Sequence, residues 1–414
     1  MFKTASGLFI DIWFNNFNAP LTLDNVESLL IVNNIYDKLP TIRMTLIDDK
    51  NIFANKLQLT DGLKISVYIG NFLDNGSNKR DEQDLMYSLM FDMVSAPEVK
   101  IETSAKKITI YGVLNFLAYW KDSKPFHYTG TSNEIFKLIA KELDLKYHGV
   151  KTNDYMTWHN FSKSKAEFVS DVTDRAYIKD GSCMLSYITI DGGFHLIDVN
   201  SEKNPDYILI PIGADDPKNK VYRYSNINYN YNSALNNLTY GYKNTSYQYS
   251  FARSDYYTKD TKALNKYADK ENSTIKLDYN YSDYYNLNRY DYDLIDQVNS
   301  EVDSINVGNV HPNWNKAYYQ NKRYKSLFNV YCEVYIDNIT PINVGDKIQV
   351  AFESINDLTD KSLYDFKYWI VESKTIGLSM KRYTEKLLLS TTGFLKDYWQ
   401  NLSPKDKESR PENA

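Results

Sequence analysis

The sequence predicts a mainly β protein of the α+β class, with two similar small antiparallel β-barrels joined by an α+β middle domain. Three observations lead to this prediction. Apolar and polar residues alternate as in strands at both ends of the chain, helical periodicity is confined to the middle, and one ordered set of strand motifs occurs at both ends. A chain of 414 residues has the length of about two to four domains.

Residues 1–120 are predicted to form the first tube-like barrel. In the segment TIRMTLI, the apolar side chains of Ile42, Met44 and Leu46 alternate with polar ones, which is typical of a strand with one buried face. The segments LFIDIWF, LKISVYI and KKITIYGVL also read as strands, and the turn pair DG at 61–62 precedes LKISVYI. Several short strands separated by turn signals favour a small antiparallel sandwich or barrel.

Residues 121–215 are predicted to form a compact α+β domain. The segments TSNE at 131–134 and SKAE at 164–167 have the spacing of capping boxes, and apolar residues at helical intervals follow each of them. The segment MLSYITIDGGFHLIDV then reads as a β-hairpin that turns at residues 191–193. The helices and the hairpin together make one folded unit.

The strand pattern returns in the last part of the chain. The second tube-like barrel is assigned to residues 216–242 and 326–399, on segments such as VYRYSNINYNYN, DKIQVAF and TEKLLLS. Residues 243–325 between these parts are an insertion rich in Tyr and Asn and poor in aliphatic residues. Residues 400–414 are charged and contain proline, so we expect a flexible C-terminal tail.

The two ends of the chain carry matching motifs in the same order. KISV at 64–67 matches KIQV at 347–350, and NFLAYW at 115–120 matches GFLKDYW at 393–399. The distances between the two motifs are nearly equal, and one loop would absorb the difference. An ordered series of matches at near-equal spacing predicts an internal duplication. The alternative is two unrelated β-domains that share strand composition.

Two copies of one barrel in a chain suit a threefold ring. Three chains related by closed C3 symmetry would present six barrels, which makes a pseudo-sixfold rim on a threefold body. Such a ring could join a sixfold partner to a threefold one. The homotrimer is a hypothesis that follows from the duplication.

Three segments carry a resemblance to a known family. They are IDDKNIFANKLQLTDGLKISVYI, MTWHNFSKSKAEFVSDVTDRAYIKDGSCMLSYITIDGGFHLIDV, and VGDKIQVAF with FKYWIVESKTIGLSMKRYTEKLLL. The middle segment has a Trp, then an xxFxxxVxxxA helix, then an apolar hairpin. On these packing patterns the chain resembles the central baseplate hub protein of tailed, myovirus-like bacteriophages, and it is similar to the hub part of type VI secretion spike proteins. The resemblance covers essentially the whole chain.

This resemblance implies a structural protein of the virion tail. The family forms a homotrimeric ring that caps the hexameric tail tube, seats the trimeric central spike and leaves an axial channel for genome passage. The implied partners are a second and third copy of the chain, the tail tube protein, the central spike protein, and the tape-measure or neighbouring baseplate proteins. The implied place of assembly is the host bacterial cytoplasm.

Charge and hydropathy narrow the function classes. The formal net charge of −5 argues against a duplex-DNA binder held by a basic face. A mildly acidic protein is consistent with a channel through which DNA slides without sticking. No run of apolar residues approaches the roughly 18 that suggest a transmembrane helix, so no membrane-spanning segment is predicted.

The chain shows no recognisable catalytic or nucleotide-binding motif, so we expect no enzymatic activity, no cofactor and no metal site. The five histidines are scattered, and His159 and His195 are expected to be packed or surface side chains. Cys183 and Cys332 lack C-x-x-C spacing and are predicted to be buried thiols.

The candidate interface residues are aromatic. Tyrosine combines a large apolar ring with a hydroxyl that tolerates water, which suits a protein interface or a sugar-stacking platform. We favour the interface for the stretch YNYSDYYNLNRYDYD at 279–293. Trp120 and Trp399 lie at matched barrel ends and are expected at the core or at a domain junction, with ring contacts as the alternative. The candidate residues are Tyr281, Tyr284, Tyr285, Tyr290, Trp120 and Trp399.

Two other functions stay open at this point. The Tyr/Asn-rich insertion could belong to a carbohydrate-binding adhesin or receptor-binding tail protein, which binding to a glycan array would favour. A tail-tip cell-wall hydrolase is the third reading, which clearing of a peptidoglycan suspension would favour.

Overall fold

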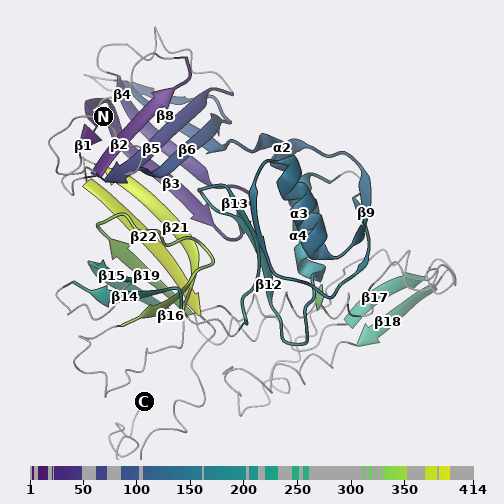
Figure 1. Ribbon diagram of the computed structural model, residues 1–414. Helices are drawn as coiled ribbons and strands as arrows, with labels where there is room; N and C mark the ends of the chain where they lie inside the picture. The colour runs from purple at the N-terminus through teal and green to yellow at the C-terminus, as the bar shows by residue number, and fades with distance from the viewer. Residues whose placement is uncertain are drawn as a thin grey trace, which may run out of the picture.

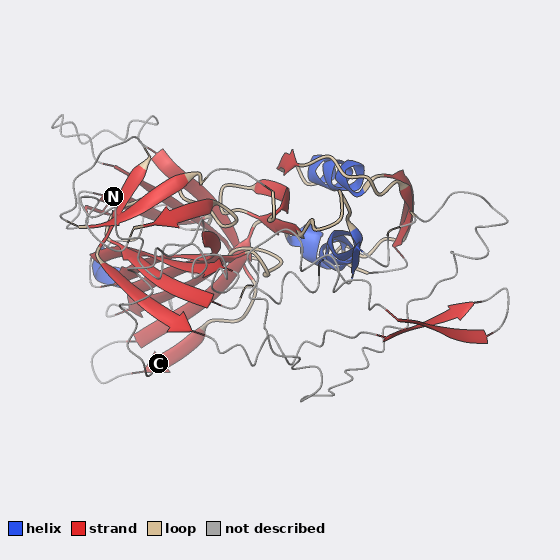
Figure 2. Cartoon of the chain, turned by 90° about the horizontal axis from the view of Figure 1, so that it is seen from below, coloured by secondary structure: helices blue, strands red, loops and turns tan. Residues whose placement is uncertain are grey.

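The structure is a computed structural model of the 414-residue chain. It describes residues 2–3, 8–16, 21, 23–48, 62–71, 85–101, 106–160, 163–201, 205–212, 220–231, 245–250, 255–260, 311, 313, 317–318, 321, 328, 330–351, 369–379 and 382–391. Within these ranges, fifteen strands belong to one large sheet, and three small sheets lie outside it. Figure 1 shows the large sheet curling through two barrels beside a separate middle domain, and Figure 2 shows the two longer helices gathered on the side away from the barrels. The predicted mainly β fold is confirmed.

The first barrel is built from the strands that the alternating segments predict. Its order in the sheet is β1-β2-β5-β6-β8-β4-β3, with β7 paired to β8. The amide of Leu21 donates to the carbonyl of Ile12 at 2.9 Å, which brings the segment before β3 against β2. The elements are β1 (Phe2–Lys3), β2 (Leu8–Phe14), η1 (Leu23–Asn25), β3 (Val26–Asn34), β4 (Thr41–Asp48), β5 (Lys64–Asn71), β6 (Leu85–Met93), β7 (Glu98–Ile101) and β8 (Lys106–Leu114).

The middle domain contains both predicted helices and the predicted hairpin. Complete capping boxes begin α3 at Thr131 and α4 at Ser164, where each hydroxyl accepts from an N3 amide and each N3 glutamate returns the bond. The hairpin pairs β12 with β13 around a glycine with positive φ, Gly192. The elements are α2 (Leu117–Lys121), β9 (Phe126–Gly130), α3 (Ser132–Glu142), β10 (Lys146–Gly149), β11 (Met156–Asn160), α4 (Lys165–Arg175), β12 (Met184–Ile188) and β13 (Gly193–Asp198).

The strands of the second barrel follow one another around a circuit, which hydrogen-bonded pairs complete except between β15 and β16, where only the chain connects them. β14 pairs with β15, the chain continues after Ser225 into β16, and the circuit returns through β19, β22, β21 and β20 to β14. The strands are β14 (Tyr207–Pro211), β15 (Val221–Tyr224), β16 (Asn226–Tyr231), β19 (Val330–Ile336), β20 (Lys347–Val350), β21 (Trp369–Ser379) and β22 (Arg382–Thr391).

β14 corrects two expectations. The sequence division places this strand at the end of the middle domain, but its hydrogen-bonded partners are β15 and β20 of the second barrel. Both of these pairings are parallel, so this barrel is not purely antiparallel. Alternation of side chains shows that a strand has one buried face, but it carries no information about the direction of its neighbours.

Five strands of each barrel follow the same order. The antiparallel neighbours run β3-β4-β8-β6-β5 in the first barrel and β16-β19-β22-β21-β20 in the second. The order along the chain is the same too. Beyond these five strands the barrels differ, because β2 lies antiparallel to β5 whereas β14 lies parallel to β20.

The hydrogen-bonded registers also show which residues of the first barrel are equivalent to which residues of the second. Read outward from Lys64 and Lys347 through each ladder, the equivalent positions are Asp92 and Ile370, Val113 and Ser390, Thr41 and Tyr331, and Val32 and Asn230.

A matching glycine turn supports these equivalences independently. Gly62 and Gly345 each precede the equivalent lysine by two residues, and both have a φ of 82°. The amide of Gly62 donates to the carbonyl of Met93 at 2.9 Å, and the amide of Gly345 donates to the carbonyl of Val371 at 2.8 Å. The amides of Met93 and Val371 each donate back to the residue after the glycine, at 2.9 and 3.0 Å. The two barrels therefore share local backbone geometry as well as strand order.

Part of the predicted insertion packs on the middle domain. The side-chain amide of Asn321 donates to the carbonyls of Thr173, Asp174 and Ala176 at the C-terminal end of α4, at 3.0 to 3.2 Å. His311 is also buried there, with its Nε2 3.2 Å from the carbonyl oxygen of Arg175. His311 and Asn321 therefore lie against the C-terminal end of α4. Elsewhere in the insertion, β17 (Thr245–Ser250) and β18 (Asp255–Asp260) form an antiparallel pair.

The apolar interior is divided into two clusters. The first combines the first barrel with the helices of the middle domain, and the second combines the second barrel with part of the β12–β13 hairpin. β21 contributes to both, because Ile376 and Leu378 belong to the first cluster whereas Ile370 and Val371 belong to the second. β22 does the same, with Tyr383 in the first cluster and Leu387 and Leu389 in the second, so these adjacent strands link the two cores.

Candidate functional site: the seam between the barrels

Among the described strands, the pair β3–β21 joins the two barrels. Residues 373–379 of β21 pair antiparallel with residues 28–34 of β3, while the same part of β21 also pairs with β22. The amide of Ile35 extends this contact by donating to the carbonyl of Glu372 at 3.0 Å. We call the β3–β21 pair and the side chains that it covers the barrel seam. Because backbone hydrogen bonds continue across it, the seam fixes the orientation of one barrel relative to the other.

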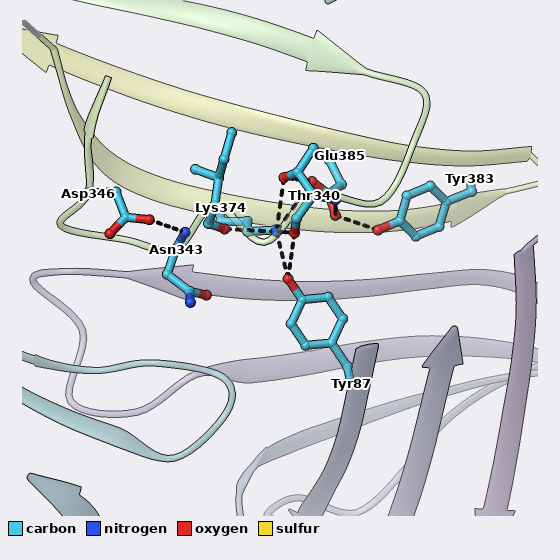
Figure 3. A network of polar contacts seen from close by, with 8 residues as sticks. Tyr87, Thr340, Asn343, Asp346, Lys374, Tyr383 and Glu385 are labelled. Carbon is cyan, nitrogen blue, oxygen red and sulfur yellow. Dashed lines mark hydrogen bonds and ion pairs between the residues drawn. The ribbon is translucent and has the colours of Figure 1, made fainter. Parts of the chain in front are cut away.

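A buried ion pair lies at the seam. The amine of Lys374 is 3.2 Å from a carboxylate oxygen of Glu385, and the two side chains are 1% and 0% exposed. The same amine donates to the hydroxyl of Tyr87 and to the carbonyls of Thr340 and Ile342, each at 2.9 Å. Figure 3 shows Tyr87 reaching from the first barrel to this amine. The Lys374 amine therefore contacts a strand of the first barrel and the loop before β20, and it lies on a strand of the second barrel.

The carboxylate of Glu385 is hydrogen-bonded as well. It accepts from the hydroxyl and the amide of Thr340 at 2.6 and 3.2 Å and from the hydroxyl of Tyr383 at 2.6 Å. Taking two charges out of water costs several kcal/mol for each ion, on the order of what good geometry and further hydrogen bonds recover. The pair therefore contributes a defined geometry that depends on both barrels being in place.

The protonation states keep this network intact near neutral pH. Burial by itself lowers the pKa of Lys374, but the carboxylate of Glu385 and the hydroxyl of Tyr87 raise it, and the resulting pKa lies above the usual value. Burial raises the pKa of the Tyr383 phenol, and the neighbouring Glu385 carboxylate raises it further. Burial likewise raises the pKa of Tyr87. The amine is therefore charged and both phenols are neutral donors.

Stacked rings lie where the middle domain meets the second barrel. His195 on β13 stacks on His148 and on Tyr187, with centroid distances of 4.9 and 5.0 Å. Tyr187 also packs against the turn at Gly345, where its hydroxyl occupies the space that a Cβ would need. Burial, and then the nearby His148, lower the pKa of His195 to about 4.

The His195 stack predicts a pH-dependent stability. The folded protein keeps His195 neutral down to about pH 4, whereas in the unfolded chain the imidazole takes up a proton near pH 6.5. Its contribution to stability is therefore fully present above pH 6.5 and is lost as the pH falls through about 4. We expect His195→Phe to flatten the fall in Tm over this interval, because phenylalanine takes up no proton in either state. Equal slopes for His195→Phe and the unchanged protein would contradict the prediction.

The structure describes one of the six candidate interface residues. Trp120 lies on α2, where the first barrel passes into the middle domain, and it is 38% exposed. Its neighbour Tyr119 is 5% exposed and packs edge-on against Phe194. Trp120 is therefore partly exposed on α2, while Tyr119 lies in the core, and a role of Trp120 at an interface stays a prediction. Tyr281, Tyr284, Tyr285, Tyr290 and Trp399 lie outside the described residues.

Sequence reasoning missed Lys374 and Glu385. A signal for Glu385 exists in RYTEKLLLST, because it falls in phase with Tyr383, Leu387 and Leu389, which all face the interior. A charge at an inward position of an alternating strand indicates a buried partner. Lys374 pairs with Glu385 from the adjacent strand β21, but the contact of its amine with Tyr87, 287 residues away, was not readable from the sequence.

Three further features are the two cysteines, possible groups of metal ligands and the length of the helices. Cys183 and Cys332 are buried thiols outside any disulfide, as predicted. Among the described residues, no group of three or more His, Cys, Asp and Glu is placed to hold a metal ion. None of the helices in the described ranges has both the length and the apolar character that crossing a membrane needs.

Solved structures provide the comparison with known proteins. No family model matches the chain, and no curated protein matches its sequence. The 43 kDa tail protein of prophage MuSo2 from Shewanella oneidensis aligns with a TM-score of 0.53 at 9% identity, covering 92% of this chain and 95% of its own. The tail protein from Neisseria meningitidis MC58 gives 0.51 at 10% identity, covering 94% and 98%. The chain has the fold of these tail proteins.

A third match is weaker. An E. coli component of the type VI secretion system, described as similar to tail proteins of bacteriophage T4, gives a TM-score of 0.47 at 7% identity and covers 91% of this chain and 76% of its own. The predicted resemblance to phage tail proteins is confirmed at the level of fold by the Shewanella and Neisseria structures. The near-complete coverage of both tail proteins means that barrels and middle domain are matched together.

Proposed function

We propose that this chain is a structural protein of a phage-type tail, a baseplate hub that works as a homotrimer. The observation that supports this best is the barrel seam, because it joins two barrels that share the order of five strands side by side in one continuous sheet. Three such chains in a closed ring would place six barrels around one axis. The protein would then offer a pseudo-sixfold face to a tail tube and a threefold face to a spike.

The proposal includes the internal duplication. The shared order of five strands and the matching turns at Gly62 and Gly345 support descent of both barrels from one unit. In this proposal the barrels diverged after the duplication, so that β14 lies parallel to β20 whereas β2 lies antiparallel to β5. The domain division follows from this, with β14 moved from the middle domain to the second barrel.

The partners belong to the same proposal. A ring of this kind would bind the tail tube protein and the central spike protein, contact the tape-measure or neighbouring baseplate proteins, and enclose an axial channel that DNA crosses without sticking. The formal net charge of −5 supports a passage with little attraction for phosphate. The work of such a hub is to match symmetries, which needs rigidity and no catalytic group.

The mass of the assembled particle tests the proposal. We expect light scattering on the purified full chain to give three times the chain mass, and averaged electron micrographs to show a ring with six peripheral lobes. A species that remains monomeric at high protein concentration would contradict it. Binding to a glycan array by that monomer would instead favour the receptor-binding reading.

A further inference from the structure

Equivalent strands of the two barrels differ in what covers them. β7 pairs with β8 as the second half of β21 pairs with β22, and this register makes Val99 equivalent to Ile376 and Ile101 equivalent to Leu378. The equivalent part of β21 has a second neighbour, β3, on its other side. In the described part of the chain, β7 pairs with β8 alone. β7 therefore lacks the neighbour that its counterpart has.

The exposure of the side chains shows the same contrast. Ile376 and Leu378 are 1% and 2% exposed, whereas Val99 and Ile101 are 55% and 76% exposed. Apolar side chains on an exposed edge strand favour pairing with another chain unless they are covered. β7 thus has apolar residues at the same positions as the seam strand β21, but in β7 these residues are exposed.

A complementary edge exists on the second barrel. β16 is equivalent to β3 and pairs with β19, as β3 pairs with β4. Among the strands that the structure describes, β16 has no second neighbour in the large sheet, whereas β3 is covered by β21. Ile227 on β16 is partly exposed, and the equivalent Leu29 on β3 is 1% exposed. Each chain therefore has one complete seam, the β3–β21 pair. It also has two strands, β7 and β16, that are equivalent to the seam strands but have no such partner among the described strands.

We propose that β7 of one chain pairs antiparallel with β16 of a second copy, in a seam between chains that repeats the β3–β21 seam within the chain. The equivalences fix the register. Gly377 opposes Leu30 within the chain, so Lys100 opposes Asn228 of the next copy and Ile101 opposes Ile227 of the next copy. A contact between two different edges is heterologous and closes into a ring when the rotation allows. The inference rests on the proposed homotrimer and supplies its contact.

Disulfide trapping tests the register directly. Residues opposite one another in antiparallel strands have Cβ atoms about 4.5–5.5 Å apart, close enough for a disulfide after small adjustments. Under mild oxidation we expect Lys100→Cys/Asn228→Cys to give covalent dimers and trimers on a denaturing gel. The within-chain control Leu30→Cys/Gly377→Cys should oxidise at monomer mass, because a Cβ at Gly377 makes only ordinary contacts. The native cysteines are both buried and should not interfere.

Mixing separates the proposed pairing from symmetric ones. Chains with only Lys100→Cys and chains with only Asn228→Cys should crosslink when mixed and reassembled, and neither should crosslink alone. Crosslinking of Lys100→Cys with itself would overturn the proposal, because it would mean that β7 pairs with β7. Equal yield from Lys100→Cys/Asn226→Cys, which is shifted by two residues, would overturn the register.

A second variant keeps the test independent of disulfide chemistry. Val99→Asp/Ile101→Asp changes two exposed side chains, so the monomer should keep its circular dichroism and its Tm. The concentration needed for half assembly should rise by more than roughly tenfold, since two apolar side chains would no longer be buried. A trimer that persists in this variant and does not crosslink through Lys100→Cys/Asn228→Cys would overturn the strand pairing but leave the hub proposal standing. A monomeric unchanged protein would overturn both.

Discussion

Replacing Glu385 with glutamine is expected to lower the free energy of unfolding by about 3–5 kcal/mol. The change leaves the ammonium group of Lys374 buried without its carboxylate partner, 3.2 Å away in the unchanged protein. It also weakens the acceptors for Thr340 and Tyr383. Chemical denaturation of the purified chain, followed by circular dichroism, measures this loss.

The matched control is Glu333→Gln on the neighbouring strand β19. Glu333 pairs with Lys386 at 2.5 Å, but the two side chains are 33% and 37% exposed. A partly exposed pair contributes about 0–1 kcal/mol, so the same substitution should have little effect there. A double-mutant cycle with Lys374→Met should show coupling between Lys374 and Glu385. Equal losses for the two glutamine variants would contradict a special role of the buried pair.

Gly345→Ala is expected to destabilise the protein more than Gly62→Ala, although the two glycines are equivalent. Both have a φ of 82°, so an L side chain costs about 1–2 kcal/mol at either position. At Gly62 a new Cβ meets nothing within 4 Å. At Gly345 it overlaps the hydroxyl of Tyr187, which is 5% exposed and stacked on His195. Overpacking there adds roughly 1–3 kcal/mol.

Gly62→Ala serves as the reference for Gly345→Ala. Because backbone geometry is the same at both turns, the difference between their unfolding free energies measures the contact with Tyr187 alone. Tyr187→Phe, which removes the overlapping hydroxyl, should recover part of the loss in the Gly345→Ala background and none in the Gly62→Ala background. Similar losses for both glycines would show that the middle domain does not press on this turn.

Local structure was predictable because its causes are local. The capping boxes at Thr131 and Ser164 form within four residues of chain, and the turn at Gly192 needs one residue with positive φ. The alternation in TIRMTLI identifies β4 and its buried face before any partner is known. The repeat of KISV and KIQV pointed to two barrels, and the structure gives these segments equivalent places in β5 and β20.

Long-range pairing was not predictable in the same way. β14 shows the limit, since its apolar residues do not alternate and its parallel direction depends on where β15 and β20 lie. The difference between β7 and the second half of β21 is similar, because in the sequence both are short segments in which every second residue is apolar. Only the presence of β3 beside β21 makes one of them a core strand and leaves the other exposed.

The sequence by itself indicated many of the strands, the capped helices and the doubled order of barrel motifs, because side-chain alternation and caps act over a few residues. The tertiary structure decided that the two barrels share one sheet, that Lys374 and Glu385 are buried together, and which sheet edges lack a described neighbour. The physical reason is that a strand edge presents the same amide and carbonyl groups whatever its side chains are. Which edge it meets is therefore set by the positions of segments hundreds of residues apart.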